Sequence, residues 1–337
     1  MNWFTDLFGF VESAGAVRSH LSVAGEWMIS SVNGARYRSG TLSTPSLSSL
    51  KERTDPLLSP DYRKDRTTLR EVVADVQTLH KDSNNRDAIF QVASQCNLLE
   101  MVGPSVTPDA GVTGYYYDRT QGPACAIACG AGTVYRNYFV PLAGGVGQTA
   151  LLQVDTMKNL ESALGGNLWS MRNGYLLPTA ATLQNISECL QATPEQWMGY
   201  IQIGVHNNVQ VTLSSDPDQI VHQLYCSAMP VSYSGIPSHI WEPLGRLVLN
   251  AAYELSVRVA IEHAQRTGSK TLFLTLLGGG AFGNPTDWIT DAILRALKIV
   301  EFSGLDVVVV SYGRSQPAVQ ELVETWRALE KSREIRL

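Results

Sequence analysis

Two uninterrupted apolar runs near the end of the chain constrain its fold more than any other feature. They are TLFLTLL (271–277) and DVVVVSY (306–312), and a stretch with helical character over about 286–300 lies between them. Strands that are apolar on both faces are typical of parallel or mixed sheets that helices cover on both sides. A strand, a helix and a second strand in this order predict a βαβ unit. The predicted fold class is therefore α/β.

Other segments add elements of the same kind. VQVTL (209–213) and HQLYCSAM (222–229) predict strands, about 241–265 predicts a long amphipathic helix, and a last helix begins near Gln316. Upstream, DAIFQVA (87–93) predicts a buried strand, and the Ala-, Cys- and Gly-rich residues 119–139 predict a tightly packed helix. Helical spacing also predicts a helix from the apolar residues Leu69, Val72, Val73, Val76 and Leu79.

The distribution of Ser, Thr, Gly and Pro divides the chain. Residues 1–65 are rich in these residue types and irregular, so we expect an N-terminal extension that packs on the body. The body then spans residues 66–337. Within it, residues 140–198 have helical fragments without a repeat, which predicts an insertion.

Composition excludes several functional classes. With 44% hydrophobic and 17% charged residues among 337, the chain is predicted to be compact and globular. Its 31 acidic residues outnumber 26 basic ones, so we expect no nucleic-acid partner. No apolar run is long enough to span a membrane and the first residues lack a basic leader, which predicts a cytoplasmic protein with no membrane partner; an exported effector would have the same features. The five cysteines form no CxxC and the histidines are scattered, so no metal site is predicted.

The glycine-rich string GGGAFGNP (278–285) lies directly between a predicted strand and the start of a helix. Such a loop offers backbone N–H groups and a helix N-terminus to an anion, which favours phosphate binding. A tight structural turn is one alternative. A Rossmann-type NAD-binding enzyme is another, because the string also satisfies G-x-G-x-x-G. That motif requires an acid after the following strand, and here Ser311 and Tyr312 stand there.

A second group of polar residues lies at the end of the strand at 87–93 and just after it. Gln91, Ser94, Gln95 and Asn97 offer neutral hydrogen-bonding groups that suit a sugar or a base. The alternative is a strand end capped by polar side chains.

These two segments resemble the macrodomain family of ADP-ribose binders. In that family a strand of the pattern D-A-I-V-N-A-A-N leads into a glycine-bearing loop, and a late strand leads into G-[IVA]-[FY]-G-x-P. Here DAIFQVAS stands at 87–94 and GAFGNP at 280–285, in the same order, with Gln91 and Ser94 in place of asparagines. The strings VASQxNLLEM, TPDAGVTGY, DRTQGPACAIA and GGGAFGNPTDWI are similar to the divergent MavL-like class, which removes mono-ADP-ribose from arginine.

The resemblance implies a three-layer α/β/α macrodomain-like fold with a mixed central sheet. It implies a metal-independent hydrolase without a cofactor, which binds ADP-ribose as ligand or product and acts on mono-ADP-ribosylated protein. The pyrophosphate is expected between the loops at 103–113 and 278–285. The residues expected to contact ADP-ribose are Asp75 (with Asp82 as a rival for adenine), Gln91, Ser94, Asn97, Glu100, Gly111, Val112, Gly279, Gly280, Ala281, Phe282, Gly283 and Asn284. A reader module that binds ADP-ribose without turnover would share nearly all of them.

Carboxylates are the expected catalytic groups, because they can pair with a guanidinium or orient water. Asp118 is the first candidate, since it lies beyond the first loop and before a predicted helix. Asp109 lies within that loop. Asp287 is the third candidate, although the first turn of a helix favours an acid in any case.

Overall fold

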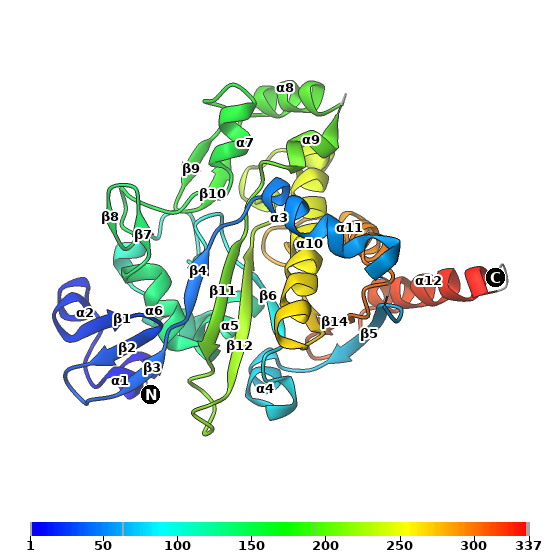
Figure 1. The fold of residues 1–337 in the computed structure, drawn as a ribbon. Coiled ribbons are helices and arrows are strands. Elements are labelled where there is room, and N and C mark those ends of the chain that lie inside the picture. Colours follow the sequence, from blue (N-terminus) through cyan, green and yellow to red (C-terminus); the bar gives the residue numbers. More distant parts are fainter. Residues whose placement is uncertain (1, 63, 192, 335–337) are drawn as a thin grey trace.

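A seven-stranded mixed sheet forms the centre of the protein, whose computed structural model describes residues 2–62, 64–191 and 193–334 (Figure 1). Its strands, in spatial order, are β4 (Thr41–Ser43), β11 (Gly204–Gln210), β12 (Ile220–Cys226), β6 (Ile89–Ala93), β13 (Thr271–Leu274), β14 (Asp306–Ser311) and β5 (Thr68–Val73). Strand β11 is antiparallel to both neighbours, and the remaining neighbours pair in parallel. The carboxyl ends of β12, β6, β13, β14 and β5 therefore meet at one edge of the sheet.

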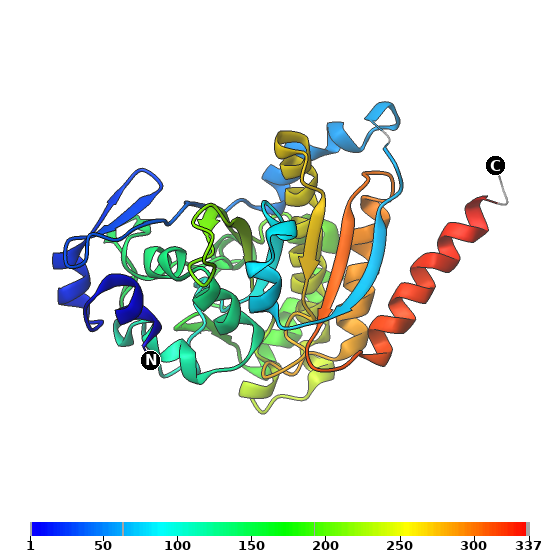
Figure 2. The ribbon, with the colours of Figure 1, turned by 90° about the horizontal axis from the view of Figure 1, so that it is seen from below.

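Helices cover both faces of this sheet. On one face lie α4 (Val76–Lys81) and α5 (Gln121–Ala128), and on the other lie α3 (Leu47–Thr54), α10 (Ser238–Thr267), α11 (Thr286–Ile299) and α12 (Pro317–Glu334). Successive strand residues alternate between the two layers: Ile89 and Val307 belong to the core shared with α10 and α12, whereas Phe90 and Val308 pack toward α5. Figure 2 shows α4 and α12 on opposite sides of the strands. The predicted α/β/α class with a mixed sheet is confirmed.

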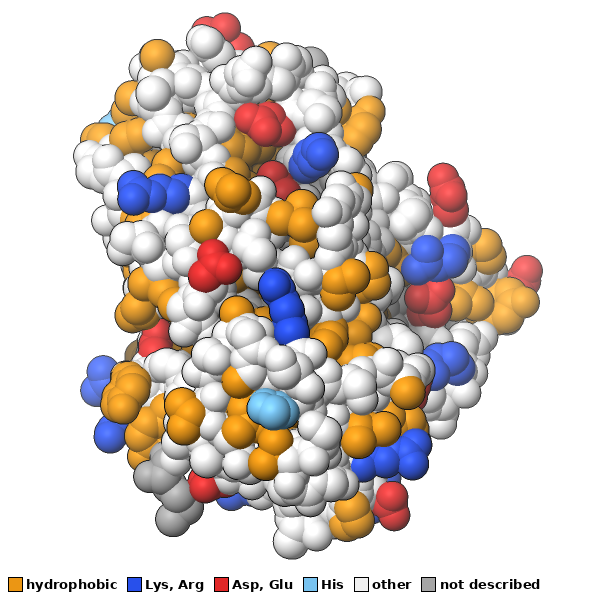
Figure 3. Space-filling model, turned by 90° about the vertical axis from the view of Figure 1, so that its left-hand side faces the viewer, with side chains coloured by type: hydrophobic (Ala, Val, Ile, Leu, Met, Phe, Trp, Pro, Cys, Tyr) orange, Lys and Arg blue, Asp and Glu red, His pale blue; other side chains and the backbone are white. Residues whose placement is uncertain are grey.

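Residues 2–43 form a small unit beside α6 (Gly130–Tyr138) and also contribute β4 to the sheet. The unit contains α1 (Trp3–Phe8), α2 (Ala14–His20), β1 (Leu21–Ala24), β2 (Trp27–Ser30) and β3 (Arg36–Arg38). Phe4, Phe8 and Val17 share a core with Ala131 and Val134 of α6. The face seen in Figure 3 carries hydrophobic side chains interspersed with charged ones.

The segment expected as an insertion folds into short elements. They are β7 (Pro141–Leu142), β8 (Gly145–Val146), α7 (Lys158–Ala163), β9 (Ser170–Arg172), β10 (Tyr175–Leu177), α8 (Ala180–Leu190) and α9 (Pro194–Met198). Short 3-10 helices complete the described chain: η1 (Asp55–Leu58), η2 (Pro60–Tyr62), η3 (Ser83–Asn85), η4 (Pro108–Ala110), η5 (Thr113–Tyr117) and η6 (Val231–Tyr233). None of the described helices is both long and apolar enough to cross a membrane.

The predicted βαβ unit is confirmed, because β13 and β14 are parallel neighbours joined by α11. The helix predicted across 69–79 is wrong. Residues 68–73 form β5, which pairs with β14 over six residues, and α4 begins only after Asp75 caps it. The strand predicted at 209–213 lies earlier, at β11, and the helix predicted at 119–139 is divided into α5 and α6 at Cys129.

Candidate functional site

A cavity of about 1270 Å³ opens at the edge of the sheet where the parallel strands end. Its walls include residues that directly follow strands: Ala74 and Asp75 after β5, Ser94 and Gln95 after β6, Thr275 to Leu277 after β13, and Tyr312 after β14. In open α/β sheets, ligands bind in a crevice at the carboxyl ends of the strands. The fold thus brings together side chains and backbone that lie far apart in the sequence.

The N-terminus of α5 forms one wall at the middle of the cavity. The side chain of Gln121 ties this helix to β6, because it accepts a hydrogen bond from Ala93 N (2.9 Å) and donates one to Gln91 O (2.8 Å). Gly122 allows the close approach, since a Cβ there would collide with the carbonyl oxygen of Ala93. The Thr120 side chain does not cap the helix. Pro123 has no N–H, but Gln121 and Gly122 line the cavity, and within the described chain their N–H groups have no hydrogen-bond partner, so they favour an anion.

The loop between β13 and α11 forms the opposite wall. Gly279, Gly280, Ala281 and Phe282 line the cavity. The turn closes on itself, because Gly283 N donates to Gly280 O (3.0 Å) and Asn284 N donates to Gly278 O (3.0 Å). Within the described chain, no hydrogen bond occupies the N–H groups of Gly280, Ala281 or Phe282. A phosphate group between this loop and α5 could accept bonds from both sides.

A carboxylate and an aromatic ring stand together at one end of the cavity. Asp75 follows β5 and Tyr312 follows the neighbouring strand β14. One oxygen of Asp75 caps α4 by accepting from Gln77 N (2.7 Å). Tyr312 is 74% exposed. A carboxylate oxygen can accept a hydrogen bond from an exocyclic amine, and the face of an aromatic ring can stack on a purine. Asp82, the rival, caps η3 and does not line the cavity.

Aromatic rings and Asp118 form the other end. The ring centroids of Tyr175 lie 5.1 Å from Tyr233 and 5.4 Å from Phe282. Burial, together with the nearby Tyr233 and Asp118, raises the pKa of the Tyr175 phenol, so this hydroxyl stays protonated and donates to Met101 O (2.9 Å). Asp118 is half-buried, and its Oδ1 accepts from Thr120 N (2.9 Å) just before α5. The carboxylate is thus held between the rings and the N-terminus of that helix.

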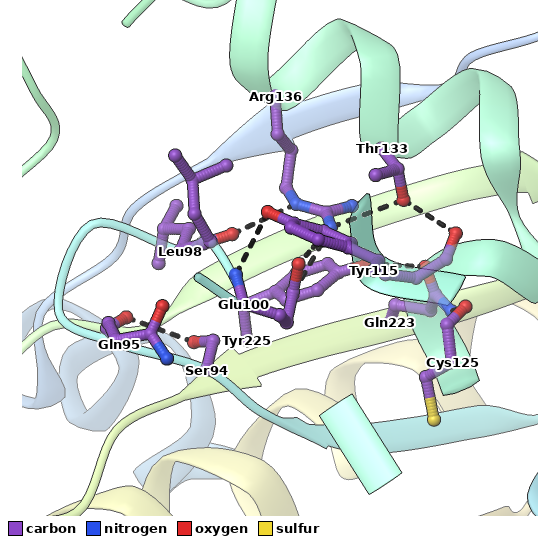
Figure 4. A network of polar contacts seen from close by, with 12 residues as sticks. Ser94, Gln95, Leu98, Glu100, Tyr115, Cys125, Thr133, Arg136, Gln223 and Tyr225 are labelled. Atoms are coloured by element: carbon purple, nitrogen blue, oxygen red, sulfur yellow. Dashed lines mark hydrogen bonds and ion pairs between the residues drawn. The ribbon is translucent and has the colours of Figure 1, made fainter. Parts of the chain in front are cut away.

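Behind this end lies a buried ion pair, drawn in Figure 4. Arg136 lies over the ring of Tyr225, 3.6 Å from its centroid, and donates to Glu100 Oε1 (3.2 Å) and Leu98 O (3.0 Å). Glu100 reaches the cavity wall although it is only 2% exposed. Burial raises the pKa of Glu100 to about 7, and Arg136 opposes this shift. Glu100 is therefore a carboxyl group that can exchange a proton near neutral pH.

The structure brings about half of the sequence-predicted residues to this cavity. Those that line it are Asp75, Ser94, Glu100, Asp118, Gly279, Gly280, Ala281 and Phe282. Those that lie outside its lining are Gln91, Asn97, Asp109, Gly111, Val112, Gly283, Asn284 and Asp287. The loop that faces residues 279–282 is therefore 118–122, in place of the expected 103–113.

The residues outside the lining have other partners. Gln91 binds Ser256 Oγ (3.0 Å) beneath the cavity floor, and Asn97 binds Gln153 (2.9 Å). The Asp109 carboxylate accepts from Ala150 N (2.7 Å).

The remaining contacts are made within loops and between helices. Glu12 accepts from Val112 N (2.8 Å), the residue after Gly111. Asn284 donates to Met229 O (2.7 Å), and Asp287 forms an exposed ion pair with Arg246 (2.5 Å).

Sequence reasoning missed several lining residues, among them Trp3, Asp6, Tyr175, Tyr233 and Tyr312. Tyr312 was visible as the last residue of a predicted strand. The others come from the extension, the insertion and a loop after β12, where no motif marks them. No three His, Cys, Asp or Glu side chains within the described ranges gather as a metal site.

Comparisons with known proteins found distant structural matches. No protein-family model matches the chain, and no curated protein matches it by sequence. A poly(ADP-ribose) glycohydrolase from Thermomonospora curvata superposes with a TM-score of 0.48 at 12% identity, over 93% of this chain and 95% of that one. The enzyme of the same name from Deinococcus radiodurans, in complex with ADP-ribose, gives 0.46 at 10%, over 85% and 93%. A macrodomain from Oceanobacillus iheyensis gives 0.35 at 11%, over 87% and 100%. Matches this distant assign no activity to this chain.

Proposed function

We propose that the protein binds ADP-ribose in this cavity and hydrolyses the bond between mono-ADP-ribose and an arginine side chain of a modified protein. The observation that carries the proposal is the order of groups along the cavity. A carboxylate and an exposed ring stand at one end, and Asp118 stands among aromatic rings at the other end. In the middle, the first turn of α5 and residues 280–282 line the cavity with backbone N–H groups that have no hydrogen-bond partner among the described residues. This order matches adenine, pyrophosphate and distal ribose.

Each part of the ligand has a partner in this assignment. Asp75 accepts a hydrogen bond from the adenine amino group, and Tyr312 stacks on the purine. The pyrophosphate lies between the N-terminus of α5 and residues 279–282, which supply backbone N–H donors. The distal ribose then lies over Phe282 with its anomeric carbon toward Asp118. The resemblance of GAFGNP and DAIFQVAS to macrodomain motifs supports the same direction of binding.

The chemistry follows from a carboxylate beside a cationic leaving group. Asp118 pairs with the guanidinium and positions the scissile bond. Water attacks the anomeric carbon, so a C–O bond forms while the C–N bond breaks and its electron pair stays on the guanidine nitrogen. Asp118 accepts the proton from the water and passes it to that nitrogen, which leaves arginine as a cation. An ester-linked or serine-linked substrate offers no positive charge to the same carboxylate.

Two measurements test the proposal. Calorimetry with ADP-ribose and with NAD should show micromolar or tighter binding of ADP-ribose. Tight binding of NAD without ADP-ribose would favour the Rossmann alternative. Incubation with arginine-, glutamate- and serine-linked ADP-ribosyl peptides should release ADP-ribose fastest from the arginine linkage. Binding without release from any of the three would refute the hydrolase and leave a reader module.

A further inference from the structure

The cavity continues beyond the place assigned to ADP-ribose, along α5 from its N-terminus (the upper end below) toward its C-terminus (the lower end). Ile127, near the end of that helix, lines it, as do Leu213, Trp3 and Asp6 beyond the helix. Because α5 has eight residues and a helix rises 1.5 Å per residue, this extension runs about 12 Å from the N-terminus of α5. We name this extension, lined by Trp3, Asp6, Tyr116, Ile127 and Leu213, the α5 groove.

Contacts between three segments that are distant in the sequence fix the walls of the groove. Trp3 Nε1 donates to Thr113 O of η5 (3.3 Å), which fixes the indole at the lower end. The same ring packs against Gly130, where a Cβ would come within 2.8 Å of it. Gly130 N, at the start of α6, donates to Thr212 Oγ1 (2.9 Å). Leu213 N donates to Ala128 O (3.4 Å), so the turn that carries Leu213 is tied to the last residue of α5. The N-terminal extension thus builds one wall of the groove.

The groove has the wrong chemistry for a second phosphate-bearing unit. Its lining is apolar apart from Asp6, and Tyr116 and Leu213 are 59% and 38% exposed. Among the described residues that line the whole cavity, the acidic ones are Asp6, Asp75, Glu100 and Asp118, against the single base Arg119. Apolar and cationic side chains suit such a surface.

The upper end of the groove adjoins the place where the scissile bond lies in the proposed function. Asp118 and Arg119 come directly before α5, and both line the same cavity as Ile127 and Leu213. The chain attached to the modified arginine therefore leaves the ADP-ribose site where the groove begins. About 12 Å accommodates three to four residues of extended polypeptide at roughly 3.3 Å each.

We propose that the α5 groove binds the polypeptide next to the ADP-ribosylated arginine and selects apolar and basic residues there. This inference rests on the proposed function, because the polypeptide is placed through Asp118. It assigns to the first helix of the chain a role in choosing the protein substrate.

The test compares a modified peptide with the free modified amino acid. The peptide carries one ADP-ribosyl arginine flanked by Leu and Lys, and a second peptide carries Gly and Ser at the same positions. Leu213→Arg and Asp6→Asn change exposed groove residues, and Leu151→Arg and Asp218→Asn make the same changes at exposed positions outside the cavity lining. Thermal unfolding of each variant and its affinity for ADP-ribose report on the fold and on the ADP-ribose site.

Both groove variants should raise the half-saturating concentration of the Leu/Lys peptide by about fivefold to tenfold, the scale of a lost apolar or charged contact. They should leave the half-saturating concentration of ADP-ribosyl arginine and the affinity for ADP-ribose unchanged. The control variants should behave as wild type in all of these measurements. Unchanged use of the Leu/Lys peptide by the groove variants, or equal use of the two peptides by the wild type, would overturn the inference. The inference would also be overturned if the groove variants bound poly(ADP-ribose) more weakly and used the Leu/Lys peptide as well as wild type does, because that result would place a second nucleotide unit in the groove. No binding of ADP-ribose by the wild type would instead refute the proposed function, and this inference with it.

Discussion

Gly280 and Gly283 lie three residues apart in the loop after β13, yet the structure gives them different roles. Gly283 has a φ of +70°, and a Cβ there would collide with Ser232 Oγ. A left-handed conformation costs a residue with a side chain about 1–2 kcal/mol before any clash. Gly280 has no such φ, and a Cβ would meet no atom within 4 Å. The free energy of unfolding should therefore fall in Gly283→Val and change by less than about 0.5 kcal/mol in Gly280→Val.

The affinity for ADP-ribose should depend on Gly280, although stability does not. A valine at 280 projects into the cavity and keeps a phosphate away from the N–H groups of residues 280–282. Loss of one such charge-assisted hydrogen bond costs about 1.5–3 kcal/mol, which is roughly a 10- to 100-fold loss of affinity for ADP-ribose. Thermal unfolding and calorimetry on both variants measure the two effects. Unchanged affinity for ADP-ribose in a well-folded Gly280→Val protein would refute phosphate binding by this loop.

Three further substitutions test the other end of the cavity. Asp118→Asn should lower the rate of hydrolysis by about 10²-fold or more while ADP-ribose still binds, as expected for loss of a proton-transfer group, and single-turnover release of ADP-ribose measures it; near wild-type turnover would exclude this role. Arg136→Met should reduce the free energy of unfolding by about 3–5 kcal/mol, because Glu100 would remain buried without its cation; denaturant titration checks this, and an unchanged midpoint would show that the pair contributes little. In the folded protein burial raises the pKa of Glu100 from 4.5 to about 7, so the folded state binds this proton more tightly than the unfolded state. The contribution of Glu100 to the free energy of unfolding is therefore fully present below pH 4.5 and is lost as the pH rises through about 7. Glu100→Gln should flatten that slope between about pH 5 and 7 in denaturant titrations, and an unchanged slope would assign it to another group.

The parts of the fold that could be predicted are those with strong, continuous patterns. The apolar runs at 271–277 and 306–312 could be satisfied only by burial on both faces, and β13 and β14 are indeed interior strands. The β5 segment misled because Leu69, Val72 and Val73 fit a helix and a strand almost equally over so short a length. Its pairing with β14 decides between them, and pairing partners are not visible in a local pattern.

The sequence could predict a site residue only where the position of that residue follows from its own segment of the chain. Ser94 follows β6 directly, and the glycines at 279 and 280 lie in the short loop between β13 and α11, so their position at the sheet edge could be inferred. Tyr175 and Tyr233 reach the cavity because the insertion and the loop after β12 fold back over the strand ends. Asp109 was a reasonable candidate by its place in the loop, but the backbone N–H of Ala150 binds its carboxylate outside the cavity.

The arrangement of charge in the cavity links binding to release of products. In the proposed function, backbone N–H groups in the middle bind the pyrophosphate without a cluster of lysines or arginines, which leaves the carboxylates at both ends to other partners. In the proposed reaction the substrate presents a guanidinium to Asp118, and the ADP-ribose product presents a neutral hydroxyl in its place. The product therefore loses one ion pair that the substrate has, and it should bind less tightly. Asp118→Asn removes that difference, so this variant should bind ADP-ribose and ADP-ribosyl arginine with nearly equal affinity, whereas a wild-type protein that binds both equally would show that Asp118 does not contact the guanidinium.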